Sequence, residues 1–386
     1  MPNQPRFLFF LADDRHPVDK NTPVWNKRLP MNPQAPPSAA SDGSGITYGE
    51  YFEAVSHFLA AGQKRVAMAA GSILGCSVQC DTFTDAAIYL EKHGAFYHPS
   101  RLVVSVQDQK IAFVVNVAIS IAGMSHLDQE VENLNRLNRM VPFSFLPKVY
   151  ASGRVVVDEK RTVGLFMGDW FEAYAEFHIS KAGEASPARL KVWDPDRGPY
   201  ELADAQAAEI YQKAAEILTA YYAVDTYEQI FSWHHAAGDF IVKFDGSRIG
   251  LKLVTVRRYE QMMRSNANDA GTVIQALLIF LINMTLRMRI DRLDGVGELM
   301  WLAPYVVSAS LSGFFKGIEA KERFGSLPKG FAGSFKTYLS RMSKLEWVDL
   351  VRAIAERLPI ESSEHSLAMD HAETHAKQIY AALRRI

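Results

Sequence analysis

LDQEVENLNRLNRM at residues 127–140 is followed by FLPKVYASGRV at 145–155 and by VGLFMGDWFEAYAEFHIS at 163–180. The first stretch carries four apolar residues at the spacing of one helix face: Leu127, Val131, Leu134 and Leu137. Glu130 lies on the same stripe, and a carboxylate there needs a partner because burying an unpaired charge is costly. The sequence therefore predicts an amphipathic helix with a buried acid, followed by two strands and a glycine-containing turn.

Length and composition are those of a globular chain with room for two lobes. The chain has 386 residues, of which 48% are hydrophobic and 22% are charged. The formal net charge of −1 gives no reason to expect a polyanion, so we expect no nucleic-acid partner. Two cysteines, Cys76 and Cys80, exclude a disulfide scaffold, and a zinc site would need two further ligands. We interpret them as buried thiols in a reducing, cytoplasmic compartment.

Apolar runs in the sequence are too short to predict a membrane partner. The run at 7–12 lacks the length of a signal-peptide core. The longest run, ALLIFLINM at 276–284, lies inside a helical pattern at 273–288, whereas a bilayer span needs ~20 apolar residues. We therefore expect a buried core helix at 273–288.

The amino-terminal part, residues 1–84, is predicted to be an arm. It contains a proline-rich loop and then an amphipathic pattern at 47–62. Thr47 or Ser44 can cap the first turn of that helix, and Gly62 can end the last. We expect this helix to pack outside the small lobe.

Beyond the arm, strands give way to helices along the chain. The predicted elements are three strands in 85–124, hairpins at 176–194 and 240–256, a helix at 204–224 and a mostly helical remainder from about 260 to 386. The second hairpin has the strongest local signal, because Asp245-Gly246 stands between two apolar runs.

This order resembles the small lobe of the protein-kinase-like fold, of the aminoglycoside-phosphotransferase type. Glu130-x-x-x-Leu134-x-x-Leu137 resembles the signature of its C-helix, 146–150 its fourth strand and 164–170 its fifth strand and hinge. The resemblance implies an α+β, two-lobed protein. Its parts would be an arm at 1–84, a small lobe with an antiparallel sheet and one C-helix at 85–175, and a helix-rich large lobe with a β-hairpin at 176–386.

An active member of this family binds ATP and Mg²⁺ through groups at fixed places. The resemblance puts Gly94 in the nucleotide-covering loop and Asn116 where the third-strand lysine is expected, near Glu130 of the C-helix. It puts Asp169 and Trp170 at the hinge, so these five residues are the candidates for cofactor binding. Asparagine cannot supply the missing charge, and the nearby substitutes for that cation are Lys92, His93 and His98.

The catalytic loop falls in SWHHAAGDF, and two registers are open. If the following hairpin sets the register, Asp239 takes the place of the metal-binding asparagine, and His234 or His235 stands near the catalytic aspartate. If instead the loop residues set the register, Ala237-Gly238-Asp239 corresponds to the His-Gly-Asp of the family's catalytic loop, and Asp239 is the catalytic base. We favour the first, because the strand must begin directly after Asp239. Thr255 then stands at the second metal position, where it is a poor magnesium ligand without carboxylate help.

Three functions follow from these residues. The favoured hypothesis is a pseudokinase that binds a nucleotide weakly or not at all and acts through a protein partner. The alternative is an active ATP-dependent phosphotransferase on a small molecule or a protein, with Asp239 binding metal or acting as base and His234 and His235 assisting. The third is acid–base chemistry by those three residues without phosphoryl transfer.

Two charged groups outside the kinase-like positions are interpreted as structural. His371 and His375 are one helical turn apart, but the order HxExH is not that of a metalloprotease, and we expect a solvated helix face. The segment RMRIDRLDGVGE at 287–298 mixes both signs of charge, and we expect an ion-pair network around the turn at Gly295.

Overall fold

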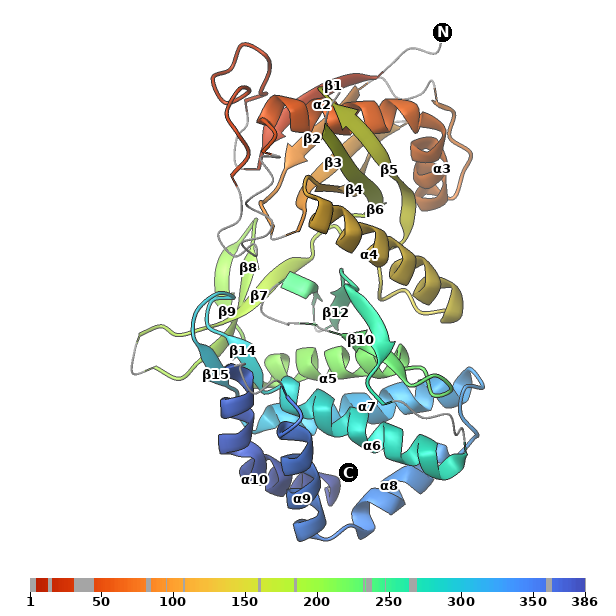
Figure 1. The fold of residues 1–386 in the computed structure, drawn as a ribbon, viewed down its shortest axis with the longest axis vertical. Helices are drawn as coiled ribbons and strands as arrows, with labels where there is room; N and C mark the ends of the chain where they lie inside the picture. Colours follow the sequence, from red (N-terminus) through yellow and green to blue (C-terminus); the bar gives the residue numbers. More distant parts are fainter. Residues whose placement is uncertain are drawn as a thin grey trace. The chain divides into compact units, whose positions relative to one another are not determined.

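The computed structural model describes most of the chain. The described residues are 5–12, 16–30, 45–80, 85–94, 96–106, 108–158, 161–183, 186–231, 233, 238–246, 248–263, 269–358 and 363–385. They form two compact units, which we describe separately. Unit 1 comprises Met1–Arg139 and Pro147–Glu172, and unit 2 comprises Met140–Leu146 and Ala173–Ile386. Both units contain helices and strands, which confirms the α+β class (Figure 1).

Unit 1 is built on a six-stranded sheet with the order β1-β2-β3-β4-β6-β5. Its strands are β1 (Arg6–Leu11), β2 (Asp85–Leu90), β3 (His98–Val106), β4 (Gln109–Ala118), β5 (Val149–Val157) and β6 (Arg161–Asp169). β1 pairs parallel with β2, and the other pairs are antiparallel. Helix α4 (Ile121–Met140) connects β4 to β5. This connectivity is the one predicted for a kinase-like small lobe with its C-helix.

Helices α2 (Tyr48–Ala61) and α3 (Gln63–Leu74) share the main core of unit 1 with one face of the sheet. Thr47 caps α2 in a capping box with Glu50, as the sequence predicted for Thr47. Alternate residues of β4 supply the centre of this core: Phe113, Val115 and Val117. Each such fully buried side chain contributes about 1.5–3 kcal/mol, so this layer accounts for much of the stability of unit 1.

Strand β1 and helices α2 and α3, which precede β2 in the chain, belong to the same compact unit as the rest of the sheet. β1 adds a parallel strand to the sheet, and the buried faces of α2 and α3 belong to the same core as the strands. The sequence treated the β1 residues only as a short apolar run. The predicted burial of both cysteines was also wrong, because Cys76 is exposed just after α3 ends at Gly75 and Cys80 is half-buried.

Unit 2 combines a five-stranded antiparallel sheet with a group of helices. Its sheet has the order β12-β11-β7-β8-β9, formed by β7 (Ala175–Ser180), β8 (Arg189–Asp194), β9 (Gly198–Glu201), β11 (Phe240–Asp245) and β12 (Arg248–Leu253). Two short strand pairs are β10 (Glu228–Phe231) with β13 (Arg258–Gln261), and β14 (Ile290–Arg292) with β15 (Leu299–Trp301). The helices are α5 (Asp204–Ala220), α6 (Ala270–Arg287), α7 (Tyr305–Arg323), α8 (Phe331–Arg341), α9 (Lys344–Ala355) and α10 (Ser363–Leu383).

Helix α6 lies at the position predicted for a core helix. It is long and apolar enough to cross a membrane by length and composition, with a mean hydropathy of 1.5, but half of it is buried inside the protein. Its buried residues include Leu277, Leu281 and Ile282. A helix that packs its apolar residues against other elements in this way is typical of a protein core.

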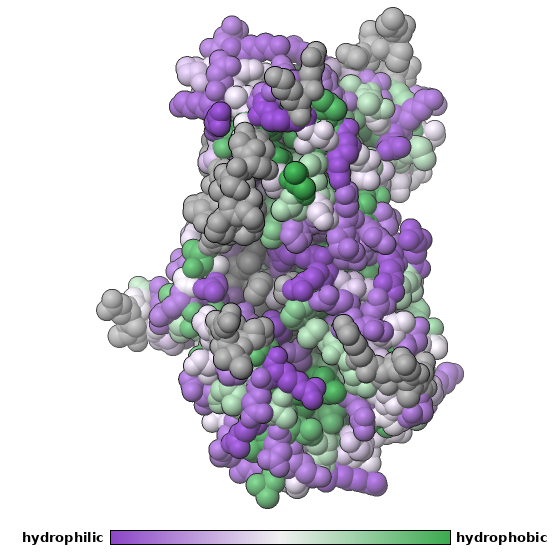
Figure 2. Space-filling model, in the orientation of Figure 1, coloured by the Kyte–Doolittle hydropathy of each residue, from purple (hydrophilic) through white to green (hydrophobic). Residues whose placement is uncertain are grey.

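The displayed face of the protein carries both polar and apolar side chains (Figure 2). Figure 2 shows that hydrophilic residues cover most of the displayed face. The most exposed large apolar side chains belong to different elements, among them Met68 of α3, Ile121 of α4 and Leu345 of α9. Single exposed apolar residues of this kind are normal on a globular surface.

Helices α5 and α7 approach each other closely because α7 has glycine at the contact. A Cβ at Gly313 would lie 1.9 Å from the backbone oxygen of Gln212 in α5. Near the carboxyl end of α5, the buried ammonium of Lys321 donates hydrogen bonds to the carbonyls of Ala220, at 2.9 Å, and Tyr222, at 2.5 Å. Burial lowers the pKa of Lys321 to about 8. These contacts hold α5 and α7 together.

We predict that Gly313→Ala lowers the free energy of unfolding by about 1–3 kcal/mol, because the added methyl forces two packed helices apart. The matched control is Gly333→Ala in α8, where a Cβ meets no atom within 4 Å. That change is expected to raise the free energy of unfolding by about 0.5–1 kcal/mol, as alanine does in a helix interior. Urea unfolding measures the free energy of unfolding of both variants. If the two substitutions change it equally, the close approach of α5 and α7 at Gly313 is contradicted.

Candidate functional site

Asp239, a predicted catalytic and metal-binding residue, is buried at the start of the β11–β12 hairpin. It directly precedes β11, and the β11–β12 hairpin turns at Asp245-Gly246, where Gly246 has a φ of 58°. Leu253 and Val254 continue from β12, and the Val254 N–H donates to the Asp239 carbonyl at 2.8 Å. Only 1% of Asp239 is exposed. The hairpin therefore fixes a buried carboxylate at the start of its first strand.

Arg257 forms a bidentate ion pair with this carboxylate. Its Nη1 is 2.8 Å from Oδ2 of Asp239, and its Nη2 is 2.7 Å from Oδ1. The Arg257 side chain is 27% exposed and stands in the connection between β12 and β13. Parallel N–H···O bonds of this kind are among the strongest polar contacts in proteins. The charge of Asp239 is thus balanced within unit 2.

This arrangement does not fit Mg²⁺. A magnesium site needs free carboxylate oxygens, and both oxygens of Asp239 accept from a permanently charged guanidinium. Thr255, at the second predicted metal position, has a buried hydroxyl with no hydrogen-bond partner in the described part of the chain. Among the described residues, no group of three His, Cys, Asp or Glu could hold a metal ion.

Two of the predicted catalytic residues, His234 and His235, lie outside the described residues. Their roles stay predictions. On the described side of the loop, Gly238 has a φ of 73°, and a Cβ there would lie 2.9 Å from Oε1 of Glu176 in β7. Glycine is required at such a position because other side chains meet both strain and a clash. Nothing in the spacing of the sequence indicates that Arg257 pairs with Asp239.

In unit 1, Asn116 and Glu130 lie on different elements. Asn116 is half-buried on β4, opposite Pro99 of β3 and Phe166 of β6. Glu130 is on the buried side of α4, with 2% of its surface exposed. The prediction that this acid faces inward from the helix is confirmed. The position expected for the lysine carries a neutral amide, so the ion pair typical of an active kinase cannot form between these two residues.

Asp169 and Trp170, the two hinge candidates, both contact other residues of unit 1. The Asp169 carboxylate accepts from the backbone N–H of Lys148 at 2.8 Å and from the Tyr150 hydroxyl at 2.5 Å. Burial, followed by the contact with Asp169, raises the pKa of Tyr150. These bonds join the end of β6 to the start of β5, which is a structural role for Asp169.

Trp170 contacts an arginine. The guanidinium carbon of Arg101 lies 5.5 Å from the Trp170 ring centre and 4.7 Å from that of Tyr89. Arg101 also pairs with Glu91 at 2.8 Å. Cation–π contacts of this kind contribute about 0.5–2 kcal/mol each. The ring expected to face a nucleotide base thus faces a paired side chain of the same unit.

Gly94 lies in the connection between β2 and β3, in which Ala95 is outside the described residues. Its N–H donates to the carbonyl of Tyr97 at 2.9 Å, and a Cβ at this position would lie 2.7 Å from the same oxygen. A phosphate-binding loop needs backbone N–H groups that are free to meet the ligand. The Gly94 N–H is used inside the connection instead.

His375 is fully buried, so the predicted solvated face of α10 was wrong at this position. Its Nε2 lies 3.2 Å from the hydroxyl of Thr285, which itself donates to the carbonyl of Ile282. His375 Nε2 is therefore the donor. Burial, reinforced by the positive charge of Arg289, lowers the pKa of His375 to about 3. The sequence missed this because the partner lies on another helix, α6.

The arginines at 287–292 make separate contacts instead of one network around Gly295. Arg287 pairs with Glu364 of α10 at 3.5 Å. Arg289 donates to the carbonyl of Leu302 and to Gln378, both at 2.6 Å. Arg292 donates to the carbonyl of Gly297 at 3.1 Å. These residues fasten α10 and the β14–β15 turn, a structural use of the charge.

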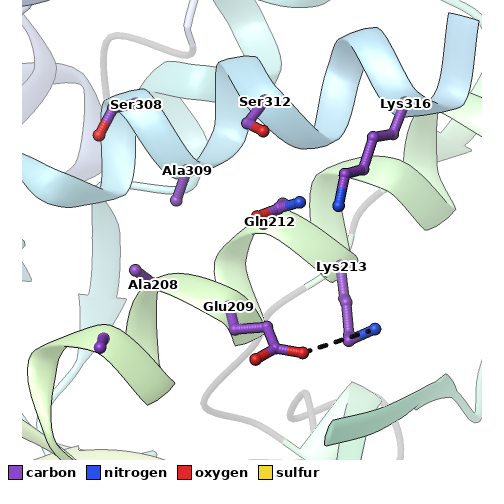
Figure 3. Close-up of a pocket in the computed structure, with 9 residues that line it drawn as sticks. Ala208, Glu209, Gln212, Lys213, Ser308, Ala309, Ser312 and Lys316 are labelled. Atoms are coloured by element: carbon purple, nitrogen blue, oxygen red, sulfur yellow. Dashed lines mark ion pairs between the residues drawn. The ribbon is translucent and has the colours of Figure 1, made fainter. Parts of the chain in front are cut away.

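A surface groove of about 450 Å³ lies between α5 and α7 of unit 2, and Asp239 is not among its lining residues (Figure 3). Its lining residues are mostly short side chains: Ala205, Ala208, Glu209, Gln212, Lys213, Ser308, Ala309, Ser312 and Lys316. Lys213 pairs with Glu209 at 3.7 Å. The groove follows from the small residues that let the two helices approach, and we assign no ligand to it.

No protein-family model and no curated protein matches this chain. One solved structure with similarity to it is "WaaP in complex with acyl carrier protein", with 11% sequence identity and a TM-score of 0.26. The match covers 61% of this chain and 85% of that chain. At these values the similarity carries no argument about this chain.

We predict that Asp239→Ala lowers the free energy of unfolding by about 3 kcal/mol. This is the low end for a broken buried pair, because Arg257 is 27% exposed and regains some solvent. The double change Asp239→Leu with Arg257→Met removes both charges and is expected to cost less than Asp239→Ala alone. Urea unfolding of wild type, Asp239→Leu, Arg257→Met and the double variant forms the cycle. Additive costs would contradict the pair.

We predict that acid destabilises the protein partly through His375. Its folded-state pKa of about 3 lies below the ordinary 6.5, so its stabilising contribution is complete above pH 6.5 and is lost as the pH falls toward 3. Between pH 7.5 and 5.0, wild type should lose about 2 kcal/mol more than His375→Gln. His371→Gln is the control, one turn away. A wild-type pH dependence equal to that of His375→Gln would refute the assignment.

Proposed function

We propose that this chain is a pseudokinase, a kinase-like protein that acts by binding a protein partner without transferring phosphate. The observation that carries the proposal is the bidentate Asp239–Arg257 pair. It supports the proposal because the one described carboxylate at the predicted metal positions is already neutralised by a cation. A fold can persist while the groups for its usual chemistry are lost.

Three features of unit 1 favour the same function. Asn116 replaces the cation that would hold phosphates, and Trp170 faces Arg101 instead of an open base site. The Gly94 N–H, which a phosphate would need, is bonded to Tyr97. Each of these contacts would have to be broken before ATP could bind in the expected way, and each break costs free energy.

We predict that 1 mM ATP with Mg²⁺ leaves the thermal midpoint of the wild-type protein unchanged. A ligand present at about 100 times its Kd would add about 2.7 kcal/mol to the stability and raise the midpoint by several degrees. The informative variant is Arg257→Ala, which removes both guanidinium hydrogen bonds to the Asp239 carboxylate. If a magnesium-dependent shift arises only in this variant, Arg257 is what blocks the metal.

A different result would reject the pseudokinase proposal. A magnesium-dependent shift in wild type that Asp239→Asn abolishes would reject the pseudokinase and favour an active phosphotransferase with a rewired site. Measuring ATP turnover in the same samples distinguishes nucleotide binding alone from catalysis. Asp196→Asn, at an exposed position between β8 and β9, is the control for loss of a surface carboxylate in unit 2.

A further inference from the structure

The stretch from Arg323 to Leu345 in unit 2 contains basic residues and no acidic residue. Its sequence, RFGSLPKGFAGSFKTYLSRMSKL, covers the end of α7, all of α8 and the start of α9. Asp and Glu make up 43 of the 386 residues of the chain, so their absence over this whole stretch concentrates positive charge here. The basic residues of the stretch are Arg323, Lys329, Lys336, Arg341 and Lys344.

The acidic residues that flank the stretch are used to cap helices. Glu322 accepts from the backbone N–H groups of Gly330 and Ala332 at the start of α8, at 3.0 and 2.6 Å. Glu346 accepts from the backbone N–H of Ser343 at 2.6 Å, in the capping box of α9. A carboxylate at a helix N-terminus is already stabilised by the N–H groups it accepts from. Neither flanking acid therefore forms an ion pair with the cations of the stretch.

Most of these cations face solvent. Lys336 is half-buried, and its Nζ lies 4.7 Å from the centre of the Phe315 ring in α7. Glu373 of α10 lies near Lys344, but its carboxylate is paired with Lys377. The exposed cations, none of which forms an ion pair with a described residue, are Arg323, Lys329, Arg341 and Lys344.

Exposed apolar side chains lie among these charges. Phe331, Tyr338 and Arg341 share one stripe of α8, because they are seven and three residues apart. The buried ring of Phe335 stacks with Phe331 at 5.8 Å and with Tyr338 at 6.2 Å between ring centres. Tyr338 is 41% exposed, and Leu345 at the start of α9 is 75% exposed. An exposed leucine alone is ordinary, but beside unpaired cations it makes the surface amphipathic.

We propose that this α8 surface, the exposed side chains of Arg323–Leu345, binds peripherally to a membrane that contains anionic lipids. Helix α8 lies at the rim of the helical group of unit 2 (Figure 1). Each Lys or Arg beside anionic headgroups strengthens such binding by about fivefold, and the Tyr338 and Leu345 side chains enter the headgroup region. This mode needs no membrane-spanning run, so a buried α6 is compatible with it.

The mixture of side chains favours a lipid surface over a soluble polyanion. A nucleic acid rewards cations and rings that stack on bases, but an exposed leucine gains nothing from it. A protein interface buries an apolar centre that is depleted of charge. Here each exposed apolar side chain has a cation close by in the chain: Arg341 follows Tyr338, and Lys344 precedes Leu345. None of the predicted kinase-like positions lies on the α8 surface, so the inference stands apart from the proposed function.

The test is co-sedimentation of the full-length protein with lipid vesicles. Vesicles of phosphatidylcholine alone are compared with vesicles of phosphatidylcholine and phosphatidylglycerol. The protein is expected to bind only the anionic vesicles, and more weakly at about 0.5 M than at about 0.1 M salt, because salt screens the attraction. Failure to bind the anionic vesicles, or equal binding to both kinds, would overturn the proposal.

A charge-reversal pair locates the binding on the α8 surface. Arg341→Glu with Lys344→Glu is expected to lower the partition constant on anionic vesicles by at least about 25-fold, since two cations are lost. The matched control is Arg197→Glu with Arg248→Glu, at exposed positions of the unit 2 sheet, which changes the net charge equally. Thermal unfolding checks that both proteins are folded. An equal loss of binding in the two variants would mean that net charge alone acts, against the proposal.

A change of an apolar side chain separates lipid from other polyanions. Leu345→Ser keeps the charge and should weaken binding to anionic vesicles by at least about fivefold. Met68→Ser in α3, where the side chain is 74% exposed, is the control and should bind as wild type. Unchanged vesicle binding in Leu345→Ser would reject the membrane surface. So would tighter binding of the wild type to polyglutamate or single-stranded RNA than to vesicles, which would assign the cations to a soluble polyanion.

Discussion

The arrangement of the candidate site in unit 2 depends on one buried ion pair. Asp239 is 1% exposed, and a carboxylate at that depth is stable only with a partner of opposite charge. Arg257 supplies both hydrogen bonds, and the Val254 N–H adds one to the Asp239 carbonyl. The start of β11 and the connection after β12 are therefore fixed to each other by the protein itself. The Asp239 carboxylate therefore has a structural role in unit 2.

In unit 1, too, the candidate site residues contact other residues of the same unit. Strands β2 to β6 and α4 follow one another in the order that the sequence predicted, and the apolar layer between α2, α3 and the sheet stabilises them. The polar positions have other partners: Trp170 contacts Arg101, Asp169 bonds to Tyr150, and Gly94 bonds to Tyr97. Core packing and polar chemistry can thus change independently, because the first depends on burial and the second on specific atoms.

Elements with a strong local signal were predicted well from the sequence. The α2 helix begins with the capping residue Thr47, the β11–β12 hairpin turns at Asp245-Gly246, and Glu130 is buried on α4. β1 was missed, because its six residues gain their structure from a parallel partner 79 positions later. The burial of His375 was missed for a related reason, since its hydrogen-bond partner Thr285 is 90 residues away.

The sequence by itself determined which segments are helices and strands and in what order they follow, because periodicity and turn residues act over a few positions. It also determined what is lacking, such as a lysine at Asn116. Only the tertiary structure decided that Arg257 neutralises Asp239, that Arg101 stacks on Trp170 and that His93 meets His98. Those contacts depend on side-chain directions set by the folded chain, and the spacing of residues along the sequence does not encode them.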